Sequence, residues 1–422
     1  MPRKDHRTPA TSNVPPGPPG SWALVAGAVV LALVGAAVAF ALPESSPLVP
    51  EHEGGDSTWS WLYLGAAAAA FAAYLGGLWV LAGPDGACRR RAVVALACAV
   101  QLLPLAGPVL LSTDVYTYWD YARISVAHGG NPYEDVPSDF PDDPAFPLMG
   151  SYWHDTTSVY GPGFTLASEG HAAAVGESPD AAAWAYKALG ALAMVALVLL
   201  AARISPRPAF AAAFVGWNPL LALHFAGGGH NDAWMMAFVL AALALAASGR
   251  RALAGASWAA AIAIKWVPVL FLPLRLLEAR RVGRRIDHRG LAAAAVVIVA
   301  IATWRYGVGW VGAAGPLASN LAEDRASYAI PVRISHLGIP EGAVAIVFAV
   351  AFAGAYVWLL REAWRGRARL ALTAGLLLVA TSWLVPWYAV WAVPLAAVEE
   401  DRPARFLALA MSAYLLRDAV PL

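Results

Sequence analysis

Long apolar runs alternate with short polar segments along most of the chain. A membrane-spanning helix needs roughly 20 predominantly apolar residues, and a closed helical backbone satisfies its own hydrogen bonds in lipid. Such runs predict spans at residues 22–42, 59–81, 92–111, 181–202, 209–225, 233–247, 291–304, 342–360 and 406–420. The pattern therefore predicts an all-α polytopic membrane protein.

Two further apolar runs do not fit a single crossing. The run at 252–277 has basic residues on both flanks, although basic residues favour the cytoplasmic side, and it contains Lys265 with Pro268 beyond it. Two short antiparallel helices would resolve the conflict and would place Lys265 at the tip, against a polar cavity. A single tilted helix whose lysine reaches towards water is the alternative. The run at 370–398, broken at Pro386 and Pro394, is treated as a second hairpin, which brings the total to about 11 passes.

The basic segments predict which side of the membrane each connecting segment occupies. We expect residues 1–20 to be a disordered cytoplasmic tail and residues 21–422 to form one transmembrane domain in the plasma membrane. The first span contains a sequence that resembles a cleavage site, but its apolar core favours an uncleaved helix. Residues 112–180 then form a large extracytoplasmic loop, and residues 305–340 form a second one.

Composition agrees with a membrane location. The chain of 422 residues is 59% hydrophobic and only 14% charged, whereas soluble domains carry about 25% charged residues. A net charge of +1 gives no reason to expect a nucleic-acid partner. Cys88 and Cys98 lie too far apart on one segment to pair easily, so we expect free thiols. Because no Cys/His cluster has zinc-ligand spacing, we expect no cofactor, and a divalent metal remains open.

The large outer loop begins with an acid. Asp114 follows the third apolar run, and Tyr118 and Tyr121 share its helical face at spacings of four and seven residues, whereas Asp120 lies off that face. The many aromatic residues of the loop indicate that it is folded. Asp114 is a candidate general base, although a helix cap or an interfacial helix would also account for the pattern.

Other polar groups are predicted on the same side of the membrane. The turn at 229–232 carries His230 and Asp232, and Lys265 is expected to face the same cavity; Arg305, Arg333 and His336 belong to the second outer loop. An acid beside several cations suggests an anionic ligand and the removal of a proton. A polar loop residue at His230, a helix cap at Asp232 and headgroup contacts for the arginines are the simpler alternatives.

Five short motifs lie between residues 110 and 395. They are Asp114-Val115-Tyr116 with Tyr118 and Asn131-Pro132-Tyr133, Val159-Tyr160-Gly161-Pro162, Gly229-His230-Asn231-Asp232, Ile264-Lys265, and Pro386-Trp387-Tyr388 with Trp391. With these motifs the chain resembles the GT-C superfamily of membrane glycosyltransferases, and within it the actinobacterial polyprenyl-phosphate-mannose-dependent alpha-mannosyltransferases, including glycosyltransferase family 87. It differs from many relatives in having two spans before the loop and Trp266 after Lys265.

The resemblance implies a GT-C fold and an inverting transfer of a sugar, expected to be mannose, from a polyprenyl phosphate to a cell-envelope glycan or glycolipid on the outer face. It maps the catalytic base onto Asp114. The residues expected to bind the donor phosphate are His230, Lys265, Arg305 and Arg333, and those expected to shape the sugar and acceptor site are Tyr118, Asp120, Tyr121, Tyr160, Asp232, Trp387 and Tyr388. A transporter or flippase of lipid-linked sugars is the alternative, and a lipid A amino-sugar transferase would share the fold.

Overall fold

The computed structural model describes residues 21–42, 58–83, 89–283, 288–313 and 328–416. Within these ranges every regular element is a helix, as the apolar pattern predicts. The expected tail at 1–20, Cys88 and residues 314–327 of the second outer loop lie outside the described residues. Cys98 is described and is a free thiol.

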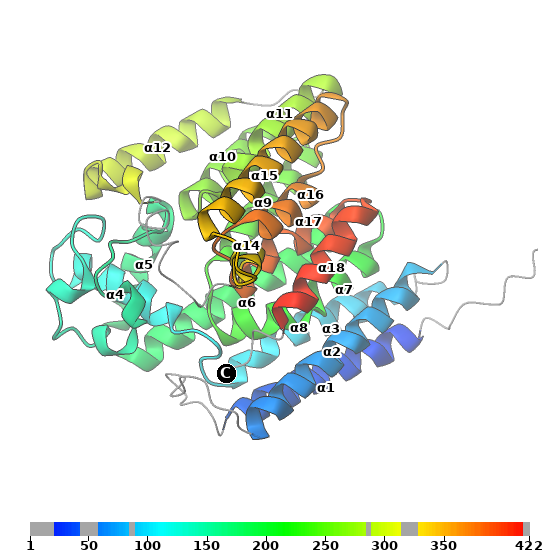
Figure 1. The fold of residues 1–422 in the computed structure, drawn as a ribbon, viewed down its shortest axis with the longest axis horizontal. Helices are drawn as coiled ribbons and strands as arrows, with labels where there is room; N and C mark the ends of the chain where they lie inside the picture. Colours follow the sequence, from blue (N-terminus) through cyan, green and yellow to red (C-terminus); the bar gives the residue numbers. More distant parts are fainter. Residues whose placement is uncertain (1–20, 43–57, 84–88, 284–287, 314–327, 417–422) are drawn as a thin grey trace, which may run out of the picture.

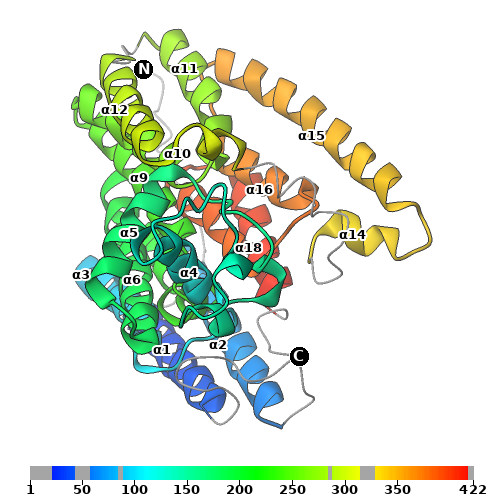
Figure 2. The same ribbon diagram turned by 90° about the vertical axis from the view of Figure 1, so that its left-hand side faces the viewer.

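The helices gather into a bundle with a lobe on one side (Figures 1 and 2). The bundle and lobe contain α1 (Ser21–Ala41), α2 (Thr58–Ala82), α3 (Arg90–Leu102), α4 (Asp114–Val126), α5 (Pro162–Val175), α6 (Pro179–Ile204), α7 (Pro208–Gly216), α8 (Pro219–Ala222), α9 (Asp232–Ala247), α10 (Arg251–Ile264), α11 (Phe271–Arg281), α12 (His288–Tyr306), α14 (Ile330–Ser335), α15 (Glu341–Trp364), α16 (Leu370–Ala380), α17 (Val393–Val398) and α18 (Arg402–Leu416).

Five described helices are long and apolar enough to cross a membrane, namely α1, α2, α6, α12 and α15. The pair formed by residues 208–216 and 219–227 makes a sixth if it counts as one span, although it bends by 55°. Only 11% of the apolar window of α12 and of α15 is buried inside the protein. Side chains such as Trp304 and Ile346 are therefore exposed, as expected for surfaces that face lipid. The total of about 11 passes stays a prediction.

Proline and asparagine shorten two of the predicted spans. The run at 92–111 is helical only to Leu102, continues as a 3-10 turn to Ala106 and becomes extended near Gly107. The prediction of one continuous helix there is wrong because Pro104 and Pro108 remove backbone donors. In the run at 209–225 the helix ends at Gly216, and a new one begins after Asn218, whose side chain accepts a hydrogen bond from the Leu220 N–H.

The run at 252–277 forms the predicted pair of short helices. α10 ends at Ile264, Lys265 has extended backbone angles, and α11 begins at Phe271 after a 3-10 turn. Residues near the start of α10 and near the end of α11 line one cavity, so the two arms run antiparallel. Lys265 consequently lies at the turn between them.

The lobe is built from residues 114–175 and contains α4, α5 and short 3-10 turns (Figure 1). Its interior holds an ion-paired cluster: Nε of Arg123 donates to both carboxylate oxygens of Asp143, at 2.8 and 2.9 Å, and Nε2 of His128 lies 2.7 Å from the same carboxylate. The aromatic outer loop is thus folded, as its composition predicts.

Candidate active site

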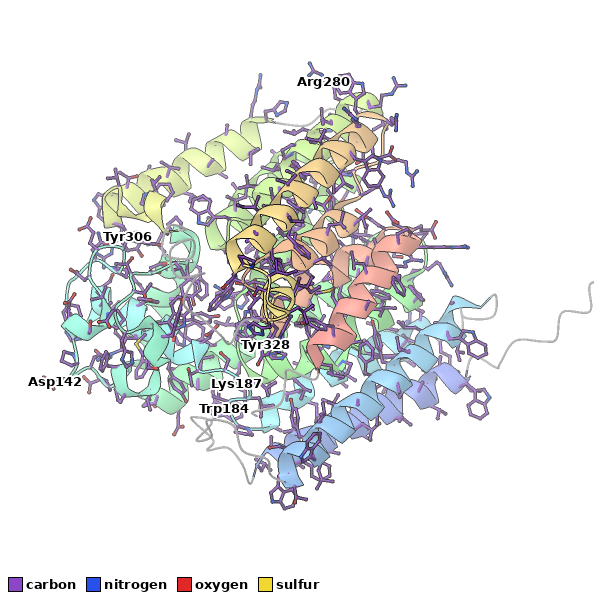
Figure 3. The ribbon with its side chains drawn as sticks, in the orientation of Figure 1. Asp142, Trp184, Lys187, Arg280, Tyr306 and Tyr328 are labelled. Atoms are coloured by element: carbon purple, nitrogen blue, oxygen red, sulfur yellow. The ribbon has the colours of Figure 1, made fainter. Side chains whose placement is uncertain are left out.

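The segment that leads into Asp114 is held by a buried lysine. Lys187 of α6 donates from Nζ to the carbonyl oxygens of Gly107 and Pro108, at 2.6 and 2.7 Å. The N–H of Leu110 donates to the carbonyl of Gly227 at 3.1 Å, which ties this segment to the turn before α9. Figure 3 shows Lys187 and Trp184 at the junction between the lobe and the bundle. These contacts set where α4 begins.

The turn that carries His230 and Asp232 requires glycine. Gly229 has a φ of 70°, and a Cβ atom there would lie 2.5 Å from Cγ1 of Val115, the residue after Asp114. A side chain at this position would therefore be strained and would also clash with the start of α4. The glycine lets the turn and α4 approach closely enough for His230 to reach Asp114.

Asp114 receives contacts from three sides. Nδ1 of His230 lies 3.2 Å from Oδ2 of Asp114, and the Tyr118 hydroxyl donates to the same oxygen at 3.2 Å. The backbone N–H of Asp114 donates to Oγ of Ser112 at 3.2 Å. The residue before the helix is Thr113, so the Asp114 side chain points into the site rather than capping α4.

The surroundings of Asp114 favour its ionised form. Burial alone would raise the pKa of this carboxyl, but the neighbouring His230, the charge of Lys265 and the contact with Ser112 together hold the pKa below its usual range. The positive end of the α4 dipole acts in the same direction. The side chain remains 17% exposed, so the carboxylate is accessible as well as ionised.

Asp232 and Lys265 form the second charged pair of the site. Nζ of Lys265 lies 2.8 and 3.0 Å from the two carboxylate oxygens of Asp232, and Nε1 of Trp391 donates to Oδ1 at 2.6 Å. The Lys265 ammonium also lies 4.5 Å from the centre of the Tyr388 ring, a cation–π distance. The Asp232 side chain is fully buried, whereas that of Lys265 is 17% exposed. The ammonium is therefore the accessible member of the pair.

Aromatic rings enclose these charged groups. The Trp387 ring stacks on His230 with centroids 3.6 Å apart and planes inclined by 12°. On the other side, the Tyr118 and Tyr160 rings meet edge to face with centroids 5.0 Å apart. The loop also reaches α10 directly, because the N–H of Gly161 donates to the carbonyl of Ile264 at 3.1 Å, beside Lys265. Residues from all five sequence motifs thus converge at one site.

Several predicted site residues lie elsewhere or have other contacts. The Tyr121 hydroxyl donates to the carbonyl of Thr156 rather than to Asp114. Asp120 lies off the Asp114 face of α4, near Asp143 and Arg123. Arg305 pairs with Glu169 at 3.1 Å, and Arg333 lies over the Tyr328 ring.

The motif at 131–133 also has contacts away from Asp114. The Asn131 side-chain amide donates to the carbonyl of Tyr306 at 3.0 Å, and the Tyr133 hydroxyl donates to the carbonyl of Tyr160 at the same distance. Asn131 and Tyr133 thus join α12 to the lobe. The described residues contain no group of three or more His, Cys, Asp or Glu side chains able to hold a metal ion.

Sequence reasoning missed two features. Lys187 is a lone cation within an apolar span, and the rarity of such groups in membrane helices could have pointed to it. Trp383 stacks on Tyr152 with centroids 5.7 Å apart and also contacts Trp153. This aromatic cluster adjoins the site because a Cβ atom at Gly150 would touch both Thr113 and Trp153. No spacing pattern links Trp383 to the loop, so this contact could not be predicted.

The chain matches one family of known proteins and several individual relatives. Residues 21–280 match the family described as "Alpha-(1->6)-mannopyranosyltransferase, N-terminal domain". Alpha-(1->6)-mannopyranosyltransferase A of Mycobacterium tuberculosis is 29% identical over 300 residues, which are 66% of this chain and 54% of that protein. The protein of the same name from Corynebacterium glutamicum is 28% identical over 179 residues, which are 41% of this chain and 36% of that protein.

The matched stretches span about half or less of the length of these relatives. No solved structure matches the chain. The family match nevertheless covers more than half of the sequence and includes Asp114, the turn at 229–232 and Lys265. The chain therefore belongs to the alpha-(1->6)-mannopyranosyltransferase family.

Proposed function

We propose that this protein transfers mannose from a polyprenyl phosphate to a glycan or glycolipid acceptor of the cell envelope, with Asp114 as the general base. Family membership and the names of the relatives support a mannosyltransferase that makes an alpha linkage. The observation that carries the proposal is an ionised, accessible carboxylate facing His230, with Lys265 close enough to lower its pKa. The lipid donor, the outer-leaflet location and the inverting course belong to the proposal.

The reaction needs one base and no acid. The acceptor hydroxyl oxygen attacks C1 of the mannose, and the bond between C1 and the phosphate oxygen breaks. That bond's electron pair leaves with polyprenyl phosphate, which is stable as an anion. The acceptor proton passes to Asp114. Because attack occurs opposite the leaving group, a beta-linked donor gives an alpha-mannoside.

The lowered pKa of Asp114 fits a late proton transfer. A carboxylate with a low pKa is a weak base towards an ordinary alcohol, but the acceptor oxygen becomes strongly acidic as it bonds to C1. Asp114 needs to be ionised and aligned at that moment, and the Tyr118 hydroxyl and His230 hold it in place. Geometry and charge, rather than high basicity, are therefore what this site supplies.

The donor phosphate is assigned to Lys265, because the His230 side chain is fully buried. An ammonium has three N–H donors, and Lys265 directs its contacts to Asp232 while staying partly exposed. His230 lies on the same turn as Asp232 and is backed by Trp387. Arg305 is not assigned to the phosphate, because it would have to give up its pairing with Glu169.

The acceptor is assigned to the aromatic cluster formed by Tyr152, Trp153 and Trp383. Tyr152 is 36% exposed, and it stacks on Trp383 near the start of α4. Aromatic rings offer broad, rigid apolar faces on which the C–H face of a sugar ring can pack. An acceptor sugar held there would present a hydroxyl towards Asp114.

The test uses the full-length protein purified into lipid nanodiscs, with polyprenyl phosphate carrying radiolabelled mannose and an oligomannoside acceptor. We expect label to appear in the acceptor, with release of polyprenyl phosphate, and an alpha-mannosidase to remove the label again. A nucleotide-linked mannose is the matched control and should give no product. Movement of intact labelled donor across proteoliposomes, without consumption of the donor, would contradict the proposal and favour a transporter.

A further inference from the structure

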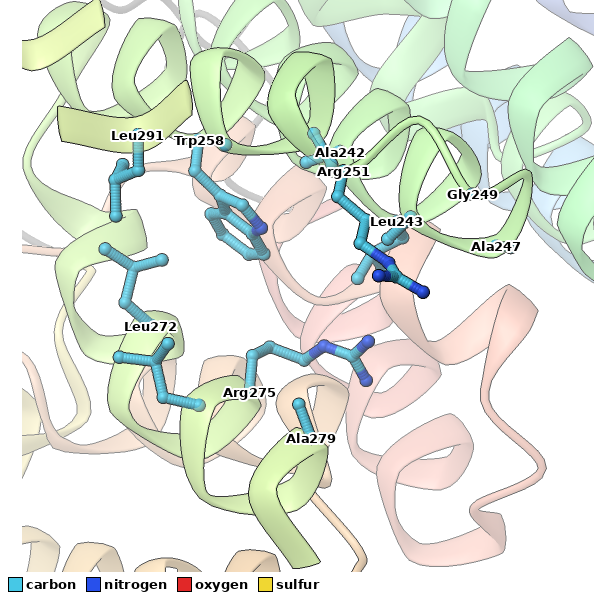
Figure 4. Close-up of a pocket in the computed structure, with 14 residues that line it drawn as sticks. Ala242, Leu243, Ala247, Gly249, Arg251, Trp258, Leu272, Arg275, Ala279 and Leu291 are labelled. Carbon is cyan, nitrogen blue, oxygen red and sulfur yellow. The ribbon is translucent and has the colours of Figure 1, made fainter. Parts of the chain in front are cut away.

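A cavity lies at the end of the α9–α10 pair that is remote from Asp232 and Lys265. Its volume is about 430 Å³, and its walls come from the end of α9, the start of α10, the facing side of α11 and the start of α12. Figure 4 shows the guanidinium groups of Arg251 and Arg275 on one side of the cavity, with Leu272, Leu291 and Trp258 around the other. The cavity is thus amphipathic, with both cations at one side and apolar walls elsewhere.

This cavity is separate from the candidate active site. α9 begins at Asp232 in that site and runs for 16 residues to Ala247, which lines the cavity. α10 returns from Arg251 in the cavity to the turn at Lys265. At 1.5 Å per residue, α9 puts roughly 15 Å between Asp232 and Ala242, where the cavity begins, and roughly 22 Å between Asp232 and Ala247 at its far end. A group bound here cannot touch Asp114, so the cavity needs an occupant of its own.

The two arginines differ in how firmly they are held. Arg275 pairs with Glu278 on the same helix, and Glu278 also accepts a hydrogen bond from the backbone N–H of Ala368, at 3.1 Å. Arg251, the first residue of α10, is exposed. Glu278 thus orients one guanidinium, and Arg251 is able to move towards a ligand. Arginine forks match phosphate oxygens better than lysine does.

We propose that this cavity binds a membrane phospholipid with an anionic phosphate headgroup. The phosphate would contact Arg251 and Arg275, and the upper part of one acyl chain would pack against Leu272, Leu291 and Trp258. Basic pockets between membrane helices bind anionic headgroups in this way, and the volume falls within the roughly 300–1,000 Å³ of ligand pockets. A free phosphate ion could contact the two arginines but would leave the apolar walls without a partner, so the lipid is favoured over the soluble anion.

The experiment is native mass spectrometry of the purified full-length protein after reconstitution with phosphatidylglycerol or with phosphatidylcholine. We expect one phosphatidylglycerol to be retained per chain and phosphatidylcholine to be lost. Arg251→Gln with Arg275→Gln should lower retention at least tenfold. The matched control is Arg280→Gln, which removes an exposed charge on α11 outside the cavity and should leave retention unchanged.

A second variant covers the case in which the double arginine variant fails to fold. Ala246→Trp fills the cavity from an exposed position at the end of α9, and Leu253→Trp adds the same ring on α10 outside it. Only the former should release the lipid, at an unchanged Tm. Equal retention by wild type and Ala246→Trp would overturn the proposal. Displacement of bound lipid by millimolar inorganic phosphate would overturn it as well, and would indicate a soluble-anion site.

Discussion

The two acids of α4 have opposite electrostatic environments. Asp114 and Asp120 lie on the same helix, yet the pKa of Asp114 is lowered and that of Asp120 is raised to about 7. Burial raises both values. At Asp114 burial is outweighed by His230, Lys265 and Ser112, whereas at Asp120 the nearby Asp143 adds to the effect of burial and Arg123 offsets it only in part.

The comparison shows that α4 carries a candidate catalytic carboxylate on one face and a carboxylate buried within the lobe on another. On the Asp114 side, the neighbours are cations and aromatic rings, and the carboxylate is partly exposed. On the Asp120 side, the neighbouring carboxylate already binds Arg123 and His128, and Oδ2 of Asp120 has no partner among the described residues. Asp114 is thus suited to accept a proton from a ligand, whereas burial and Asp143 raise the pKa of Asp120 so that it keeps its proton to a much higher pH than an ordinary aspartate.

The largest expected effect is a difference in turnover between these two acids. Asp114→Asn should lower kcat by about 10²- to 10⁴-fold, the usual contribution of a general base. Asp120→Asn, the matched control on another face of α4, should change kcat less than threefold. Steady-state transfer of labelled mannose measures both. Similar losses in the two variants would mean that both sides of α4 serve the reaction.

The charged pair at Lys265 should affect stability as well as activity. Lys265→Met leaves the fully buried Asp232 without its cation, and breaking such a pair costs about 3–5 kcal/mol. Adding Asp232→Asn should recover most of this loss in thermal unfolding, while mannose transfer stays low because the phosphate contact is still missing. If Lys265→Met alone were as stable as Lys265→Met with Asp232→Asn, burial of the unpaired Asp232 carboxylate would carry no such cost.

Asp120 should make stability depend on pH in a defined direction. The pKa of Asp120 is higher in the folded protein than in the unfolded chain. Its contribution to the free energy of unfolding is therefore fully present below the unfolded pKa of about 3.9 and is lost as the pH rises through the folded pKa of about 7. Relative to wild type, Asp120→Asn should therefore gain stability between pH 4 and pH 8, by roughly 4 kcal/mol at most. Thermal unfolding across this pH range provides the measurement. A difference that does not vary with pH would contradict the assignment.

The smallest expected effect concerns the acceptor. Trp383→Ala should raise the KM for the oligomannoside about fivefold, since an aromatic contact contributes roughly 1 kcal/mol, and should change kcat little. Trp304→Ala is the control, because that ring is 83% exposed on α12, away from the cluster. An unchanged acceptor KM in Trp383→Ala would remove the aromatic cluster from the acceptor site.

Much of the fold follows from the apolar pattern, because helix formation in lipid depends on local sequence. The spans at α1, α2, α6 and α15 match their predictions closely. The hairpin at Lys265 was also predictable, since basic flanks on both sides conflict with one crossing. The break at Asn218 was not, because its amide also donates to Ser412, a residue far away in the sequence.

The candidate site was predictable in part. Asp114, His230 and Lys265 were expected on one side of the membrane from the order of the spans, and the structure groups them. Charge alone suggested Arg305 as a phosphate ligand, but its partner Glu169 lies on α5, and only the folded chain brings the two together. Contacts of this kind depend on packing between distant segments, which the apolar pattern does not encode.

Single-turnover kinetics of Asp114→Asn test the central claim most directly, because they separate donor binding from transfer. The protein, in excess, is mixed with labelled polyprenyl-phosphate mannose and a saturating acceptor. If Asp114 takes the acceptor proton, the Kd of the donor should stay within threefold of wild type while the transfer rate falls at least 100-fold. A transfer rate within tenfold of wild type at equal donor occupancy would contradict the account.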